Sequence, residues 1–212
     1  MTGYLKNRIF CFVGITGFFV MFLLFFSGCV SSREIIEKLS DTEYTSSMYR
    51  AALEKWTKKD TIQKGLKTEL IMAATYKACE FRRAYAKERD RIFRLTTDQG
   101  KRVMNDQVNA SGQYDDFFVS IYTPDKAWND FSSKDTGWNV YLLHDNEVRI
   151  EPFEIRRLKK DKKLFKSYFP FISPWSVDYI FRFKKNDRFP LSRSVTLIIT
   201  GMPGIARLKW DM

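Results

Sequence analysis

Apolar and polar residues alternate with a period of two from Tyr114 to the end of the chain. This spacing is typical of β-strands that bury one face. Pro152 shifts the alternation, which predicts a bulge or an edge strand at that point. Asp145-Asn146 and Gly201–Gly204 have the residue types of turns between neighbouring strands. The apolar positions that we expect in the core include Phe117, Val119, Trp138, Val140, Leu142, Val177, Phe181, Val195, Leu197 and Leu208.

The first half of the chain combines one alternating segment with helical spacing. Leu66–Tyr76 alternates and predicts a strand, whereas Ser46–Lys59 and Cys79–Leu95 have apolar residues three and four apart. Thr97–Gln113 predicts a further helix that ends in a loop at Asn109–Gly112. The inner face of the first helix is expected to hold Met48, Ala51, Ala52 and Trp56.

These patterns predict a mainly β protein of the α+β class. We expect an antiparallel β-sandwich of about seven strands with two or three helices near its N-terminal side. The sandwich would form a single domain over residues 46–212, with a helical insertion at about residues 79–110.

Near the start of the chain, Lys6 and Arg8 are followed by an apolar run of eighteen residues, Ile9–Phe26. This order is typical of a secretion signal. The small residues Ser27 and Gly28 follow the run and lead directly to Cys29. Residues 1–28 are therefore interpreted as a signal peptide, with Cys29 as the first residue after cleavage.

Ser27-Gly28-Cys29 resembles the lipobox of bacterial lipoproteins, although Phe26 stands where an aliphatic residue is usual. The resemblance implies that the Cys29 thiol carries a diacylglyceryl group and that the lipid holds the protein in the membrane. Two other interpretations stay open. In the first, the apolar run stays uncleaved as a helix in the inner membrane, for which it is just long enough. In the second, it is an ordinary cleaved signal without lipid, although no A-x-A-like site follows the run.

Residues 29–45 comprise the lipidated cysteine and a polar tether. In lipoproteins of the enterobacterial type, Asp after the cysteine holds the protein at the inner membrane. Val30 occupies that position here, which implies passage to the outer membrane by the same resemblance.

The chain is strongly basic, with 36 Lys and Arg residues against 25 Asp and Glu. Loss of residues 1–28 removes Lys6 and Arg8 and no acid, so the net charge falls from +11 to +9. For a secreted protein this favours anionic lipid, glycan or another envelope protein as the partner, and not nucleic acid. Solubility alone is the other explanation of the positive charge.

Cys79 would have no disulfide partner, so we expect it to be buried as a small core residue.

Two segments are candidate binding sites: a basic segment at residues 156–163 and an aromatic segment at residues 169–175. The basic segment could bind anionic surfaces, together with Arg82, Arg83 and Arg89, or be plain solvated surface. The aromatic segment Phe169–Trp175 could cap the sandwich or offer rings to a partner or sugar. The basic residues are Arg156, Arg157, Lys159, Lys160, Lys162 and Lys163, and the candidate aromatic contacts are Phe169, Phe171 and Trp175.

Candidate catalytic chemistry is sparse in the sequence. His144 is the single histidine and lies beside a predicted turn, so we interpret it as a turn residue. Asp115-Asp116 precedes a predicted strand, where acids usually form turns and caps. We therefore expect no metal site, no cofactor and no enzymatic activity.

Three short segments give a further resemblance, to uncharacterised envelope lipoproteins of Gram-negative bacteria. They are Ala74-Thr75-Tyr76, Tyr122-Thr123-Pro124 and Phe169–Trp175. The resemblance implies no activity. The sequence thus predicts a non-catalytic structural or interaction module, with a carrier of an apolar or anionic ligand, or an envelope hydrolase, as alternatives.

Overall fold

The computed structural model describes most of the chain after residue 45. The described ranges are 46–133, 136–145, 148–159, 162–185 and 193–212. Thr45–Met212 forms one compact unit. The predicted signal peptide, Cys29 and the tether lie outside the described residues.

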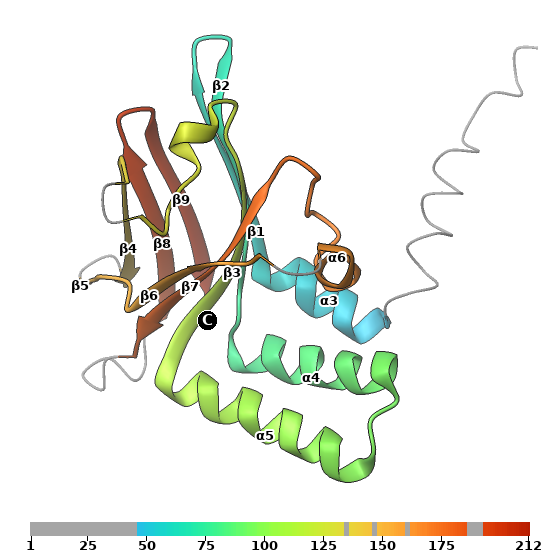
Figure 1. Cartoon of the computed structure of the whole chain (residues 1–212). Helices are drawn as coiled ribbons and strands as arrows, with labels where there is room; N and C mark the ends of the chain where they lie inside the picture. The colour runs from blue at the N-terminus through green and yellow to red at the C-terminus, as the bar shows by residue number, and fades with distance from the viewer. Residues whose placement is uncertain (1–45, 134–135, 146–147, 160–161, 186–192) are drawn as a thin grey trace, which may run out of the picture. The chain divides into compact units, whose positions relative to one another are not determined.

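Two antiparallel sheets form the centre of this unit (Figure 1). One has five strands in the order β1-β2-β3-β7-β6, and the other has four in the order β5-β4-β8-β9. The fold class predicted from sequence, an α+β sandwich, is confirmed. The strands are β1 (Thr57–Lys64), β2 (Lys67–Tyr76), β3 (Tyr114–Tyr122), β4 (Trp138–His144), β5 (Val148–Ile150), β6 (Glu154–Arg157), β7 (Val177–Lys184), β8 (Ser194–Gly201) and β9 (Gly204–Asp211).

Aromatic side chains fill the space between the sheets. Phe117 of β3 lies 5.2 Å from Trp210 of β9, and Phe131 lies 5.4 Å from Trp138 and 6.1 Å from Phe181, all between ring centroids. The core expected from the alternation is confirmed except at Val177, which is half-buried.

Helices cover the other face of the five-stranded sheet (Figure 1). The rings of Phe118 on β3 and Phe169 stack with centroids 3.8 Å apart. The Tyr49 hydroxyl donates a hydrogen bond to the Tyr168 carbonyl, 2.8 Å away, which joins two of the helices. The helices are α3 (Ser47–Trp56), α4 (Cys79–Phe93), α5 (Thr97–Gln113) and α6 (Lys162–Tyr168), with a 3₁₀ turn at Lys126–Trp128.

Strand β1 was not predicted, because the helix expected over residues 46–59 ends at Trp56. Ile62 is the one buried residue of β1, so its polar sequence shows no period of two. The strand packs beside β9, where the Asp60 carboxylate accepts a hydrogen bond from the Arg207 amide at 2.8 Å. Gly204 of β9 has φ +150°, and a Cβ there would lie 2.6 Å from Ile62 Cγ2. The close approach of these two strands therefore requires glycine.

The helices differ from the prediction in detail. The inner face of α3 holds Tyr49, Ala52, Leu53 and Trp56, whereas Met48 and Ala51 are exposed. The buried rings of Tyr49 and Trp56 thus fix the orientation of this helix. The loop expected at residues 109–112 is helical, and α5 continues to Gln113.

The connection at Pro152 passes from one sheet to the other. Strand β5 is at an edge of the four-stranded sheet and β6 is at an edge of the five-stranded sheet. The edge position predicted near this proline is therefore correct. Among the described helices, none has the length and apolar character needed to cross a bilayer.

Candidate functional site

Two neighbouring carboxylates of β3, Asp115 and Asp116, are almost completely buried. They were expected to be turn and capping residues, and this expectation is wrong. Successive residues of a strand point to opposite faces of its sheet, so the two carboxylates do not converge on one site. Each instead forms a separate polar cluster.

The Asp116 carboxylate faces the helical layer and binds two arginines. Its oxygens lie 2.7 Å from Arg82 Nη2 and 2.8 Å from Arg182 Nε. Burial opposes ionisation, but the hydrogen bonds from Arg182 and Arg82 and the charges of Arg82 and Lys77 hold the pKa of Asp116 below its ordinary value. Arg82 is about 1% exposed, so it cannot contribute to the anion-binding surface for which it was considered.

Lys77 belongs to the same cluster. Burial and the nearby positive charge of Arg82 lower the pKa of its amine to about 8. The Lys77 carbonyl accepts a hydrogen bond from Arg82 Nε at 2.7 Å, and the ammonium lies 5.7 Å from the centre of the Tyr85 ring. These contacts connect the end of β2 to α4 and stabilise the helical layer.

The Asp115 carboxylate faces the space between the sheets. The Tyr76 hydroxyl donates a hydrogen bond to it at 2.6 Å, and His144 Nε2 lies 3.2 Å from its other oxygen. Lys185 Nζ is 3.6 Å away. Burial and the Asp115 charge raise the pKa of Tyr76. His144 is the last residue of β4, beside the turn as expected, but it is buried against Asp115 and is not only a turn residue.

These two clusters are closed to a ligand, because Asp115, Asp116 and His144 are all buried. Their chemistry is that of structural ion pairs, which join β3 to β4 on one side and to α4 and β7 on the other. Within the described part of the chain, no group of three or more His, Cys, Asp or Glu residues is arranged to hold a metal ion.

The aromatic segment divides into a buried and an exposed part. Phe169 is buried, Phe171 is half-buried and Trp175 is 76% exposed. The backbone between them is held by reciprocal hydrogen bonds, from the Ser176 amide to Ser173 Oγ at 3.0 Å and from the Ser173 amide to Ser176 Oγ at 3.2 Å. The segment therefore caps the sheet through Phe169 and presents Trp175 from an ordered turn.

Trp175 borders a groove of about 550 Å³ on the outer face of β1, β2 and β3, which we call the Trp175 groove. Its lining combines apolar side chains with hydroxyl groups and one basic residue. Ile71 on its floor is half-exposed, so this part of the sheet is not covered by the helical layer. The lining includes Lys59, Thr61, Ile71, Ser120, Tyr122, Phe171, Ser173 and Trp175.

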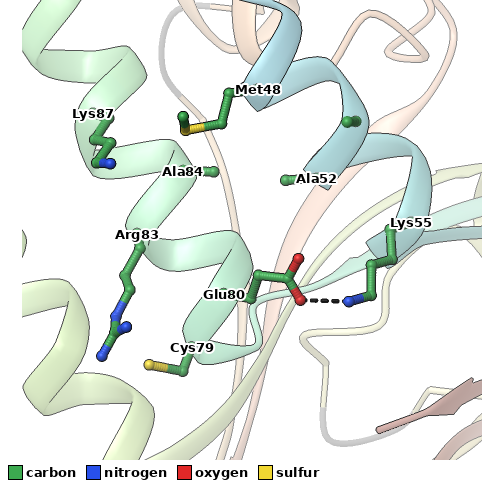
Figure 2. A pocket seen from close by; sticks show the side chains of 9 residues that line it. Met48, Ala52, Lys55, Cys79, Glu80, Arg83, Ala84 and Lys87 are labelled. Carbon is green, nitrogen blue, oxygen red and sulfur yellow. Dashed lines mark hydrogen bonds and ion pairs between the residues drawn. The ribbon is translucent and has the colours of Figure 1, made fainter.

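A second groove, of about 580 Å³, lies between α3 and α4, and we call it the α3–α4 groove (Figure 2). Ala52 and Ala84 face each other across it, and Met48 lies at one end. Cys79 lines the groove and is exposed, so the prediction that it is a buried core residue is wrong. As the first residue of α4, it lies outside the apolar stripe that contains Phe81 and Ala84.

The basic segment is described in part. Arg156, Arg157 and Lys159 are exposed, and Arg156 Nε lies 3.1 Å from the Glu154 carboxylate. Lys160 and the side chains of Lys162 and Lys163 lie outside the described residues. Arg83 and Arg89 are exposed on α4.

The sequence identified Trp175 but not its groove, because Lys59 and Thr61 of the groove lining belong to the unpredicted strand β1. No family model, curated protein or solved structure matches the chain.

Proposed function

We propose that this protein is a lipid-anchored, non-catalytic binding module of the bacterial cell envelope, and that the Trp175 groove binds a glycan. The observation that carries the glycan site is the exposed indole of Trp175 at the border of a groove rich in hydroxyl groups. A large aromatic side chain held in solvent by an ordered turn is typical of a binding surface.

The chemistry of the groove matches that of a sugar. The C–H face of a pyranose ring packs on an indole ring, while its hydroxyls exchange hydrogen bonds with side chains such as Thr61, Ser120 and Tyr122. Lys59 adds a positive charge at the same groove, which favours a glycan that carries carboxylates. The exposed bases Arg156, Arg157 and Lys159 and the net charge of +9 after loss of residues 1–28 support attraction to the same anionic surroundings.

The glycan site is tested by titrating the full chain, in a polyoxyethylene detergent without a sugar headgroup, with two tetrasaccharides. One alternates N-acetylglucosamine with N-acetylmuramic acid and carries carboxylates, and the other contains N-acetylglucosamine alone. We expect the acidic tetrasaccharide to bind more tightly. Trp175→Ala should weaken binding about fivefold or more, because truncation of an aromatic anchor costs over about 1 kcal/mol.

Two variants serve as controls. Leu66→Ala removes an exposed apolar side chain from a turn outside the groove and should leave binding unchanged. Lys59→Gln should remove the preference for the acidic sugar while retaining binding of the neutral one. Equal affinity of the wild type and Trp175→Ala, or no binding of either tetrasaccharide, would contradict a glycan site in this groove.

The anchor is tested by the intact mass of the protein extracted from membranes. We expect a chain that begins at Cys29 with a diacylglyceryl group, and an uncleaved precursor for Cys29→Ala. Even one acyl chain gives reversible membrane binding, and each buried CH₂ contributes about 0.8 kcal/mol, so two or three chains would anchor the protein stably. An unmodified chain beginning at Met1 would instead support the uncleaved helix.

A further inference from the structure

The α3–α4 groove is apolar at its floor and basic at its rim. Ala52 and Ala84 leave a gap between the two helices because neither has a side chain beyond Cβ. Met48 is 58% exposed at this gap, although most of α3 packs inward through aromatic rings. An exposed thioether beside a row of alanines offers apolar surface to a flexible, narrow ligand.

The charges around this gap are unbalanced. Lys55 lies 2.5 Å from Glu80, the one acid among the described residues that line the groove, so these two charges neutralise each other (Figure 2). Arg83 and Lys87, one turn apart on α4, have no acidic partner among the described residues. As far as the structure describes the chain, the rim therefore carries two uncompensated positive charges beside an apolar floor.

We propose that the α3–α4 groove binds an anionic lipid, with one acyl chain along the alanines and Met48 and with the acidic headgroup at Arg83 and Lys87. An apolar chain that ends in an anion matches both halves of the groove, whereas a neutral lipid leaves the cations without a partner and a free anion leaves the floor exposed. The volume of about 580 Å³ is within the range of small-molecule sites.

This site is separate from the Trp175 groove, since no described residue lines both. Lipid binding here does not depend on the glycan site. In a membrane-anchored protein, a bound anionic lipid would hold the α3–α4 surface against the bilayer, because basic residues near anionic headgroups are attracted to them.

Cys79 provides a reporter for occupancy, because its thiol is exposed and lines the groove. The full chain in octaethylene glycol dodecyl ether is treated with N-ethylmaleimide, and alkylation of the Cys79 peptide is followed by mass spectrometry. The added probes are monododecyl phosphate and inorganic phosphate. We expect monododecyl phosphate to slow alkylation at least fivefold and inorganic phosphate to leave its rate unchanged.

A matched reporter separates occupancy from a general charge effect. Ser132→Cys places a thiol at an exposed position between the 3₁₀ turn Lys126–Trp128 and β4, outside the groove lining. Its alkylation should change less than twofold on addition of monododecyl phosphate. Slowing of both cysteines to the same extent would overturn the proposal.

The rim charges are tested with Arg83→Gln combined with Lys87→Gln. Both side chains are exposed, so the fold should be retained, which far-UV circular dichroism checks. The monododecyl phosphate concentration for half-protection of Cys79 should rise about 30-fold, as expected for two basic residues. Lys101→Gln combined with Arg102→Gln removes the same charge from exposed positions of α5 and should shift it less than twofold. Absence of protection in the wild type, protection by inorganic phosphate alone, or equal shifts for both double variants would overturn the proposal.

Discussion

Replacement of Asp116 by Asn should lower the free energy of unfolding by about 3–5 kcal/mol at pH 7. The substitution retains the shape of the side chain but removes the charge that compensates Arg82 and Arg182. Arg82 and Asp116 are each about 1% exposed, so solvent cannot replace the lost partner of Arg82. The measurement is chemical denaturation of the wild type and the variant at pH 7.

The same measurement has a predicted pH dependence. Because the pKa of Asp116 is lowered in the folded protein, the folded state favours the ionised carboxylate. This stabilisation is present above the unfolded pKa of about 3.9 and is lost as the pH falls through the lower, folded value. The difference in stability between wild type and Asp116→Asn should therefore be constant above about pH 5 and decrease in acid.

Asp106→Asn is the matched control for this prediction. Asp106 is exposed on α5, and its substitution should change the free energy of unfolding by less than about 0.5 kcal/mol. If Asp116→Asn and Asp106→Asn have similar effects, the buried ion pairs do not stabilise the fold as described.

The second large effect is expected for Phe181→Ala, at about 3–5 kcal/mol of unfolding free energy. Phe181 is fully buried between the sheets, where its ring packs near Phe131 and Tyr179. Truncation removes apolar contacts and leaves a cavity that the surrounding rings cannot fill without moving. Since the free energy of unfolding of a small domain is about 5–15 kcal/mol, this change would remove a large part of it.

Phe93→Ala is the control for ring removal, because Phe93 is the last residue of α4 and is about half-exposed. Its cost should be less than about 1 kcal/mol. Thermal or chemical unfolding of both variants makes the comparison. A small cost for Phe181→Ala would mean that the sheets do not pack through this ring.

The sandwich could be predicted because one face of most strands is buried and the other is not. The core positions from Trp138 to Leu208, except the half-buried Val177, follow directly from that alternation. Strand β1 could not be predicted, because it buries Ile62 alone and is otherwise polar. The inner face of α3 was predicted in part for a related reason: Ala52 and Trp56 are buried as expected, but contact with the partner surface places Tyr49 inward and not Met48.

The candidate sites depended on long-range contacts that the sequence does not show. In the sequence, Asp115 and Asp116 look like polar residues at the start of a strand. The structure places Tyr76 and His144 against Asp115 and Arg82 against Asp116, which the sequence does not show. Trp175 could be singled out as an aromatic in a segment with two prolines, but its exposure and its place at a groove over β1, β2 and β3 could not be predicted from the sequence.

Oxidative footprinting of the five tryptophans is the most direct test of glycan binding in the Trp175 groove. Trp56, Trp138 and Trp210 are buried, Trp128 is half-buried, and Trp175 is exposed, so Trp175 should react fastest in the free protein. Addition of the acidic tetrasaccharide should protect Trp175 and leave Trp128 unchanged. Continued rapid oxidation of Trp175 at saturating tetrasaccharide would contradict a glycan site in this groove.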